Sequence, residues 1–141
     1  MEVIETQNTF VKNFIYKAKK DRALFELNSR GKRIEFLRKL NHSYLDYLDE
    51  TKLTLIQKKE VDDFLYIKEN LKVRETDLCL VISNYREIDN KIMTFKDAFD
   101  EIYGFGLASL LVFENAEKIY LQTEQEQGAP NKYIGKNQNY R

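Results

Sequence analysis

The sequence predicts an α+β domain, in which an N-terminal antiparallel helix pair and a third helix pack on a small three-stranded sheet with one crossover helix. An apolar run at Leu78–Ile82 is followed by a helical pattern at Thr94–Tyr103 and a second apolar run at Leu107–Phe113. This change of period is typical of a strand, crossover helix, strand unit. The alternating Ile119 and Leu121 then predict a hairpin that returns to a third strand.

Two helical patterns lie on either side of Gly31 in the N-terminal part of the chain. The first predicts a helix over residues 8–27, preceded by a short lead, and the second predicts a helix that ends near Leu48. The short connection between them indicates that they pack as an antiparallel pair. A loop is expected over 49–55, and a narrow apolar stripe over 57–70 predicts a surface helix.

The crossover helix has recognisable signals at both ends. Thr94 followed three residues later by Asp97 resembles a capping box, and Gly104 stands where a C-cap glycine is expected. The segment Gly104-Phe105-Gly106 has two interpretations, because its glycines permit unusual backbone angles. It forms either a ligand-facing loop at a strand edge or a tight turn that places Phe105 in the core.

The composition changes abruptly near the C-terminal end. Apart from Pro130, residues 124–132 contain no apolar side chain larger than alanine. The sequence therefore predicts a single domain over 1–123 and a polar C-terminal tail over 124–141. The residues of this tail expected to dock on the domain or on another chain are Tyr133, Ile134 and Tyr140.

Composition and charge limit the class of protein. The 141 residues are 43% hydrophobic and 33% charged, which excludes wholesale disorder, and their formal net charge is zero. We expect no general attraction to nucleic acid or to an anionic membrane. The acidic N-terminus and the lack of a long apolar window predict a cytoplasmic protein without a membrane contact. The single cysteine, Cys79, lies in an apolar run and is expected to be a buried thiol.

Recognisable catalytic and cofactor motifs are missing from the sequence. It has no phosphate-binding glycine loop, no dinucleotide-binding glycine motif, no nucleophile elbow and no cysteine pair. Its one histidine, His42, excludes a His-rich metal site. Carboxylates four residues apart, such as Asp97 and Glu101, are interpreted as solvated helix faces. The sequence therefore predicts a protein that is not an enzyme and has no cofactor or metal.

Charge is distributed unevenly along the chain. Residues 1–40 carry ten Lys and Arg against five acids, a net charge of +5, whereas residues 41–115 carry nine basic and fifteen acidic groups, a net charge of −6. The chain also has nine tyrosines and no tryptophan. Tyrosine is enriched at protein interfaces, although an AT-rich genome would explain the same count.

Three functional hypotheses follow. The first is a non-catalytic protein-binding module, such as an immunity protein or an antitoxin-like inhibitor, whose acidic stretch Glu87–Glu101 contacts a basic partner such as a nuclease. The second is a nucleic-acid-binding accessory protein that uses the basic N-terminal helices. The third is an enzyme with a dispersed carboxylate site. Self-association is left open by all three.

The first two hypotheses each imply a set of contact residues. The candidate protein-binding residues are Tyr85, Glu87, Asp89, Asp97, Asp100 and Glu101. The candidate nucleic-acid-binding residues are Lys19, Lys20, Arg22, Lys32 and Arg33.

Overall fold

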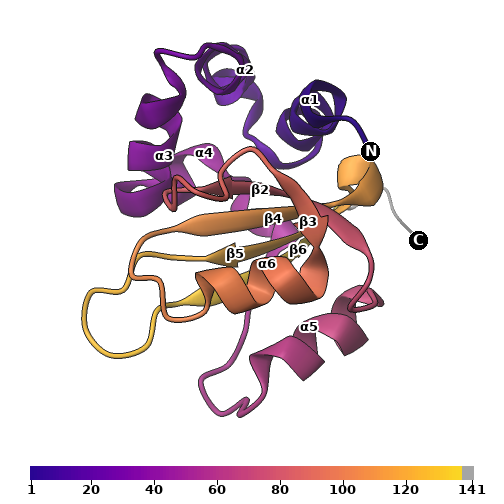
Figure 1. The fold of residues 1–141 in the computed structure, drawn as a ribbon. Coiled ribbons are helices and arrows are strands. Elements are labelled where there is room, and N and C mark those ends of the chain that lie inside the picture. Colours follow the sequence, from indigo (N-terminus) through magenta and orange to yellow (C-terminus); the bar gives the residue numbers. More distant parts are fainter. Residues whose placement is uncertain (138–141) are drawn as a thin grey trace.

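The computed structural model describes residues 1–137, and within this range it has a six-stranded antiparallel sheet with helices on both faces (Figure 1). The strand order is β1-β6-β5-β4-β2-β3. The strands are β1 (Leu53–Leu55), β2 (Leu78–Ser83), β3 (Ile92–Thr94), β4 (Ser109–Phe113), β5 (Lys118–Gln122) and β6 (Lys132–Lys136). The α+β class is confirmed, whereas the predicted sheet of three strands is too small, because β1, β3 and β6 were not expected.

The helices form two layers, with α1–α4 on one face of the sheet and α5 and α6 on the other (Figure 1). The α-helices are α1 (Val3–Phe14), α2 (Lys20–Asn28), α3 (Arg33–His42), α4 (Tyr44–Tyr47), α5 (Asp63–Leu71) and α6 (Phe95–Ile102). Single 3-10 turns are η1 (Lys17–Lys19), η2 (Glu50–Lys52) and η3 (Glu114–Ala116).

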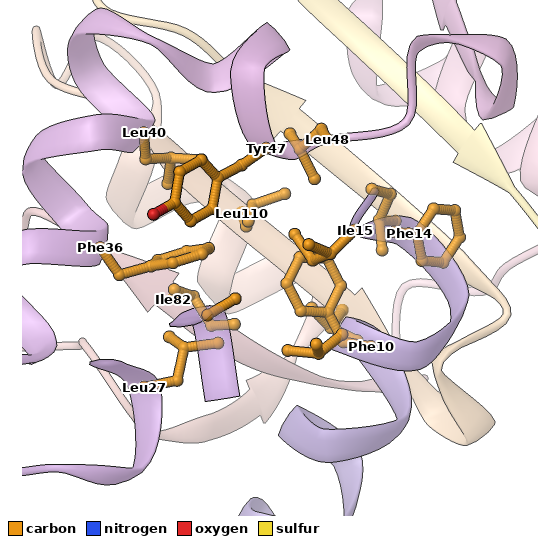
Figure 2. Packing of buried hydrophobic residues seen from close by; sticks show 14 of the residues in the cluster. Phe10, Phe14, Ile15, Leu27, Phe36, Leu40, Tyr47, Leu48, Ile82 and Leu110 are labelled. Atoms are coloured by element: carbon orange, nitrogen blue, oxygen red, sulfur yellow. The ribbon is translucent and has the colours of Figure 1, made fainter. Parts of the chain in front are cut away.

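Two hydrophobic cores lie on opposite faces of the sheet. Alternate residues of a strand point to opposite faces, so Leu80 and Ile82 of β2 enter the core under α1–α4, whereas Cys79 and Val81 enter the core under α5 and α6. Figure 2 shows the α1–α4 core, in which Ile82 and Leu110 of the sheet pack against aromatic side chains from the helices. The unbroken apolar runs of β2 and β4 are therefore explained by burial on both faces.

The single cysteine lies in the α5–α6 core. Cys79 is fully buried, and this burial raises the pKa of its thiol to about 12. The thiol therefore stays protonated at neutral pH and contributes as a small apolar side chain.

The predicted crossover helix is confirmed, but its connection differs from the expectation. Thr94 caps α6 by accepting a hydrogen bond from the Asp97 amide at 3.2 Å, and Gly104 ends it with a φ of +79°. The strand before the helix is β3 rather than β2. Because β3 and β4 are both antiparallel to β2, they run parallel to one another on either side of it. The helix therefore joins two strands that are not neighbours.

The helix predicted over 8–27 is in fact two helices. The chain leaves α1 at Ile15, whose extended backbone bridges to Leu48, and the Tyr16 amide donates to the Tyr47 carbonyl at 2.9 Å. These long-range hydrogen bonds outweigh the local helical pattern. Helix α1 also begins earlier than expected, because the Glu2 side chain caps the amides of Ile4 and Glu5.

The second and third predicted helices also have different limits. The second is divided into α3 and α4 at Ser43, whose ψ of 34° is not helical. The third, α5, begins at Asp63 rather than near residue 57, because the Asp62 side chain accepts a hydrogen bond from the Leu65 amide at 3.0 Å. The expected loop over 49–55 contains η2 and β1.

Part of the predicted C-terminal tail belongs to the sheet. Strand β6 lies between β1 and β5, and the side chain of Ile134 is buried in the α5–α6 core. On the opposite face the hydroxyls of Tyr133 and Tyr44 are 3.1 Å apart. Burial, together with this hydrogen bond, raises the pKa of Tyr133 to about 12. The third tail residue expected to dock, Tyr140, lies outside the described residues.

Gly135 provides a test of the position of β6. A Cβ atom there would lie 2.6 Å from Cγ1 of Ile119 on β5 and 3.2 Å from Cδ2 of Leu53 on β1. We expect Gly135→Ala to lower the free energy of unfolding by about 1–3 kcal/mol because the added methyl group overpacks this position. Urea denaturation measures the change.

The matched control for this substitution is Gly31→Ala. A Cβ atom at Gly31 meets no other atom within 4 Å, so this variant should unfold close to the wild-type urea concentration. Equal stability of the two variants would contradict the placement of β6 between β1 and β5.

Candidate functional site

The segment after β2 and the segment before β4 lie side by side at one end of these two central strands. Ser83 at the end of β2 pairs with Ser109 at the start of β4, and their hydroxyls are 2.7 Å apart. The turn after β2 and the loop before β4 are therefore neighbours. The buried side chain of Gln122 supports this loop, because its amide nitrogen donates to the Ile102 carbonyl at the end of α6 at 2.8 Å and to the Phe105 carbonyl in the loop at 3.4 Å.

Tyr85 from the turn and Phe105 from the loop stack on one another. Their ring centroids are 4.9 Å apart and their planes differ by only 16°. Tyr85 packs against the α5–α6 core, and both rings remain partly exposed. Phe105 thus takes neither of its two expected roles in full, since it lies in a short turn but outside the core.

One carboxylate contacts this ring pair, and a second acts on it through its charge. The Tyr85 hydroxyl donates to Oε2 of Glu87 at 3.4 Å. The pKa of Tyr85 is raised, first by the negative charge of Glu87, then by partial burial and by the charge of Glu101. Both carboxylates are exposed, and over residues 1–137 neither forms an ion pair with Lys or Arg, in contrast to Asp100. We call Tyr85, Glu87, Glu101 and Phe105 the Tyr85–Phe105 surface.

The other two acids of α6 differ in their surroundings. Asp100 pairs with Lys96 at 2.6 Å, and this hydrogen bond is the main reason that the pKa of Lys96 is raised. Asp97 is exposed in the first turn of the helix, one turn before Glu101. Over residues 1–137 neither Asp97 nor Glu101 forms an ion pair, so unpaired negative charge lies one turn apart along α6.

Asp89 does not belong to an open acidic surface. Its two carboxylate oxygens accept from Nε and Nη2 of Arg33 at 2.7 and 2.9 Å, and one of them also accepts from the Ser83 amide at 2.9 Å. Arg33 in turn donates to the Gln7 side chain at 2.5 Å. Asp89 and Arg33, predicted for two different partners, are thus bound to each other, with only 14% and 13% of their side chains exposed.

The remaining basic candidates are spread over the α1–α4 layer. Lys20 donates to the Lys12 carbonyl at 2.7 Å, close to the end of α1. Lys19 lies over the ring of Tyr47, 5.5 Å from its centroid. Lys32 is exposed just before α3. Arg22 is half exposed and pairs with Glu26 at 2.9 Å.

Glu26 is a buried carboxylate that no motif or spacing in the sequence distinguishes from the other acids. It is fully buried, and its Oε2 atom accepts from Arg22 at 2.9 Å and from Lys39 at 2.6 Å. Burial alone would lower the pKa of Lys39, but its hydrogen bonds to Glu26 and Tyr47 raise it. The second oxygen, Oε1, has no hydrogen-bond partner among the described residues. Because Glu26 engages Arg22 and Lys39, the basic layer has less free charge than its sequence indicates.

The described part of the chain contains no metal site and no membrane-spanning helix. Within residues 1–137 no three or more His, Cys, Asp and Glu side chains are grouped to hold a metal ion. No helix in that range has the length and apolar character needed to cross a membrane. The chain matches no protein-family model, no curated protein and no solved structure.

The proximity of Glu87 to Tyr85 predicts a measurable pKa change. A nearby negative charge opposes formation of the phenolate, so Glu87→Gln should lower the pKa of Tyr85 toward the ordinary tyrosine value. NMR titration of the Tyr85 ring carbons, assigned with Tyr85→Phe, measures this shift. Asp100→Asn should leave it unchanged because Asp100 is paired with Lys96. An unshifted Tyr85 in Glu87→Gln would contradict the arrangement of the Tyr85–Phe105 surface.

The Arg33–Asp89 pair predicts a large stability difference. Asp89→Asn leaves the partly buried guanidinium without its carboxylate, so the free energy of unfolding should fall by about 2–4 kcal/mol. Asp46→Asn makes the same chemical change on an exposed side chain and should have little effect. In urea denaturation, the double variant Arg33→Gln/Asp89→Asn should lose less than the sum of the single variants. Additive losses would show that the two groups act independently.

Proposed function

We propose that this chain is a protein-binding module that neutralises or regulates a basic partner, in the manner of an immunity protein or an antitoxin-like inhibitor. The partner contacts the Tyr85–Phe105 surface. One observation carries the proposal: two exposed carboxylates and two stacked rings converge there from separate segments, and neither carboxylate pairs with a cation in the described part of the chain.

The chemistry of this surface suits a protein partner. Partly exposed aromatic rings supply contact area with little loss of side-chain entropy, and aromatic residues are enriched in the centres of interfaces. Unpaired carboxylates around them attract a positively charged partner and orient it on approach. Glu87 and Glu101 would thus contribute mainly to the rate and specificity of association, and Tyr85 and Phe105 to the lifetime of the complex.

The same geometry disfavours nucleic acid as the main partner. The Tyr85–Phe105 surface is acidic and would repel phosphates. Of the basic residues considered for this role, Arg22 is engaged by Glu26 and Arg33 by Asp89, which leaves them less free to contact a phosphate backbone. Nucleic-acid binding by the α1–α4 layer remains the alternative hypothesis.

The experiment uses three versions of the full-length protein as bait in a lysate of the native host: wild type, Glu87→Gln/Glu101→Gln and Asp100→Asn. We expect wild type and Asp100→Asn to retain a basic protein in equal molar amount, and the double variant to lose it. With the purified partner, the double variant should bind about tenfold more weakly at low ionic strength, and the difference should shrink as salt is added.

Two results would contradict the proposal. One is that no stoichiometric partner is retained, and the other is that the double variant retains the partner as well as wild type does. A labelled duplex DNA provides the arm for the alternative. Tight, salt-sensitive DNA binding that is lost in Lys19→Gln/Lys20→Gln/Arg22→Gln would favour a nucleic-acid partner instead.

A further inference from the structure

The stacked rings of the Tyr85–Phe105 surface favour one kind of side chain in a binding partner. Tyr85 packs on the α5–α6 core, and Phe105 lies outside that core and stacks on Tyr85. The two rings therefore form a flat stack that extends from the core towards the solvent. The planes of the rings are within 16° of parallel, so a third planar group can continue the stack.

We propose that the surface recognises an arginine side chain of its partner, with the guanidinium laid flat on the exposed part of the ring stack and hydrogen-bonded to Glu87 or Glu101. This inference rests on the proposed protein-binding function and specifies the residue that the surface reads. Arginine fits for two reasons. Its guanidinium is planar and stacks on aromatic rings, and its parallel N–H groups match the two oxygens of a carboxylate.

Lysine fits the same surface less well. An ammonium group is a strongly hydrated point charge, so it gains from the carboxylates but does not continue a planar stack. The chain itself contains a related arginine. The Arg22 guanidinium lies 5.4 Å from the centroid of the Phe25 ring while its Nε atom donates to the Glu26 carboxylate at 2.9 Å. The Tyr85–Phe105 surface offers the same two kinds of contact, and over residues 1–137 the neighbouring exposed Arg86 forms neither an ion pair nor a ring contact there.

The neighbouring acids show why a partner's cation would bind at the Tyr85–Phe105 surface and not beside it. Asp89 is occupied by Arg33, and Asp100 by Lys96, so neither is free to bind a partner's cation. Glu87 and Glu101 lie beside the rings, and their charges reach the Tyr85 hydroxyl. A cation placed on the stack would therefore be attracted by the charges of both carboxylates.

The test titrates the full-length protein with two fluorescein-labelled peptides that differ only in their cation. Both alternate the basic residue with glycine, one with arginine and the other with lysine, at equal length and charge. Fluorescence anisotropy gives the dissociation constants. We expect the arginine peptide to bind about fivefold more tightly than the lysine peptide, which is the advantage of one additional cation–π contact.

Two kinds of variant separate the ring contact from the charge contact. Phe105→Leu keeps apolar bulk but removes the ring, so the preference for arginine should disappear because the arginine peptide loses more affinity than the lysine peptide. Glu87→Gln/Glu101→Gln should weaken the binding of both peptides, and Asp100→Asn should change neither. Urea denaturation of each variant shows that it is folded, and Phe105→Tyr, which retains a ring, should retain the preference for arginine.

The outcomes distinguish this inference from the proposed function. Equal binding of the two peptides, with both weakened in Glu87→Gln/Glu101→Gln, overturns the arginine inference and leaves the basic-partner proposal standing. A preference for arginine that survives in Phe105→Leu also overturns it, because the ring would then not be the contact. Failure of both peptides to bind overturns the inference, whereas the proposed function is decided separately by the retention of a partner from the host lysate.

Discussion

The fold depends on the burial of two central strands on both of their faces. In β2, Leu80 and Ile82 point to one side and Cys79 and Val81 to the other, and all four are completely buried. Each such aliphatic side chain contributes about 1.5–3 kcal/mol when it is removed from water. A single helical layer would leave half of this apolar surface exposed. The chain therefore needs α1–α4 on one side and α5 and α6 on the other, which leaves helix exteriors and sheet edges for contacts.

Charged side chains form hydrogen bonds between the helical layer α1–α4 and the sheet. Arg33 on α3 holds Asp89 in the turn after β2, and it also contacts Gln7 of α1 and the Leu27 carbonyl at the end of α2. The same turn carries Tyr85. The position of the Tyr85–Phe105 surface, on one side of the sheet, is thus tied to the packing of helices on the other side. The basic N-terminal part and the acidic central part of the chain therefore neutralise one another in part through the Arg33–Asp89 pair.

The elements that could be predicted are those whose local signals agree with their tertiary contacts. Strands β2, β4 and β5 have long apolar patterns, and α6 has a cap at each end. The three-residue strands β1 and β3 have no periodicity to detect, and the break at Ile15 depends on Leu48, which is distant in the sequence. The site shows the same division. The proximity of Tyr85 to Glu101 follows from the topology of the strands and helix that carry them. The ion pair between Asp89 and Arg33 could not be predicted, because the two residues are far apart in the sequence and no local pattern indicates it.

The strand order also has a consequence for how the protein is made. Within the described sheet, β1 has β6 as its one neighbour, with Leu53 opposite Gly135, and the Ile56 amide donates to the Lys132 carbonyl at 2.8 Å. A ribosome releases the chain from its N-terminus, so β1 emerges long before the segment that pairs with it. The nascent sheet ends at β5 until then, and β1 and β6 can join it only after the segment 132–136 has been translated.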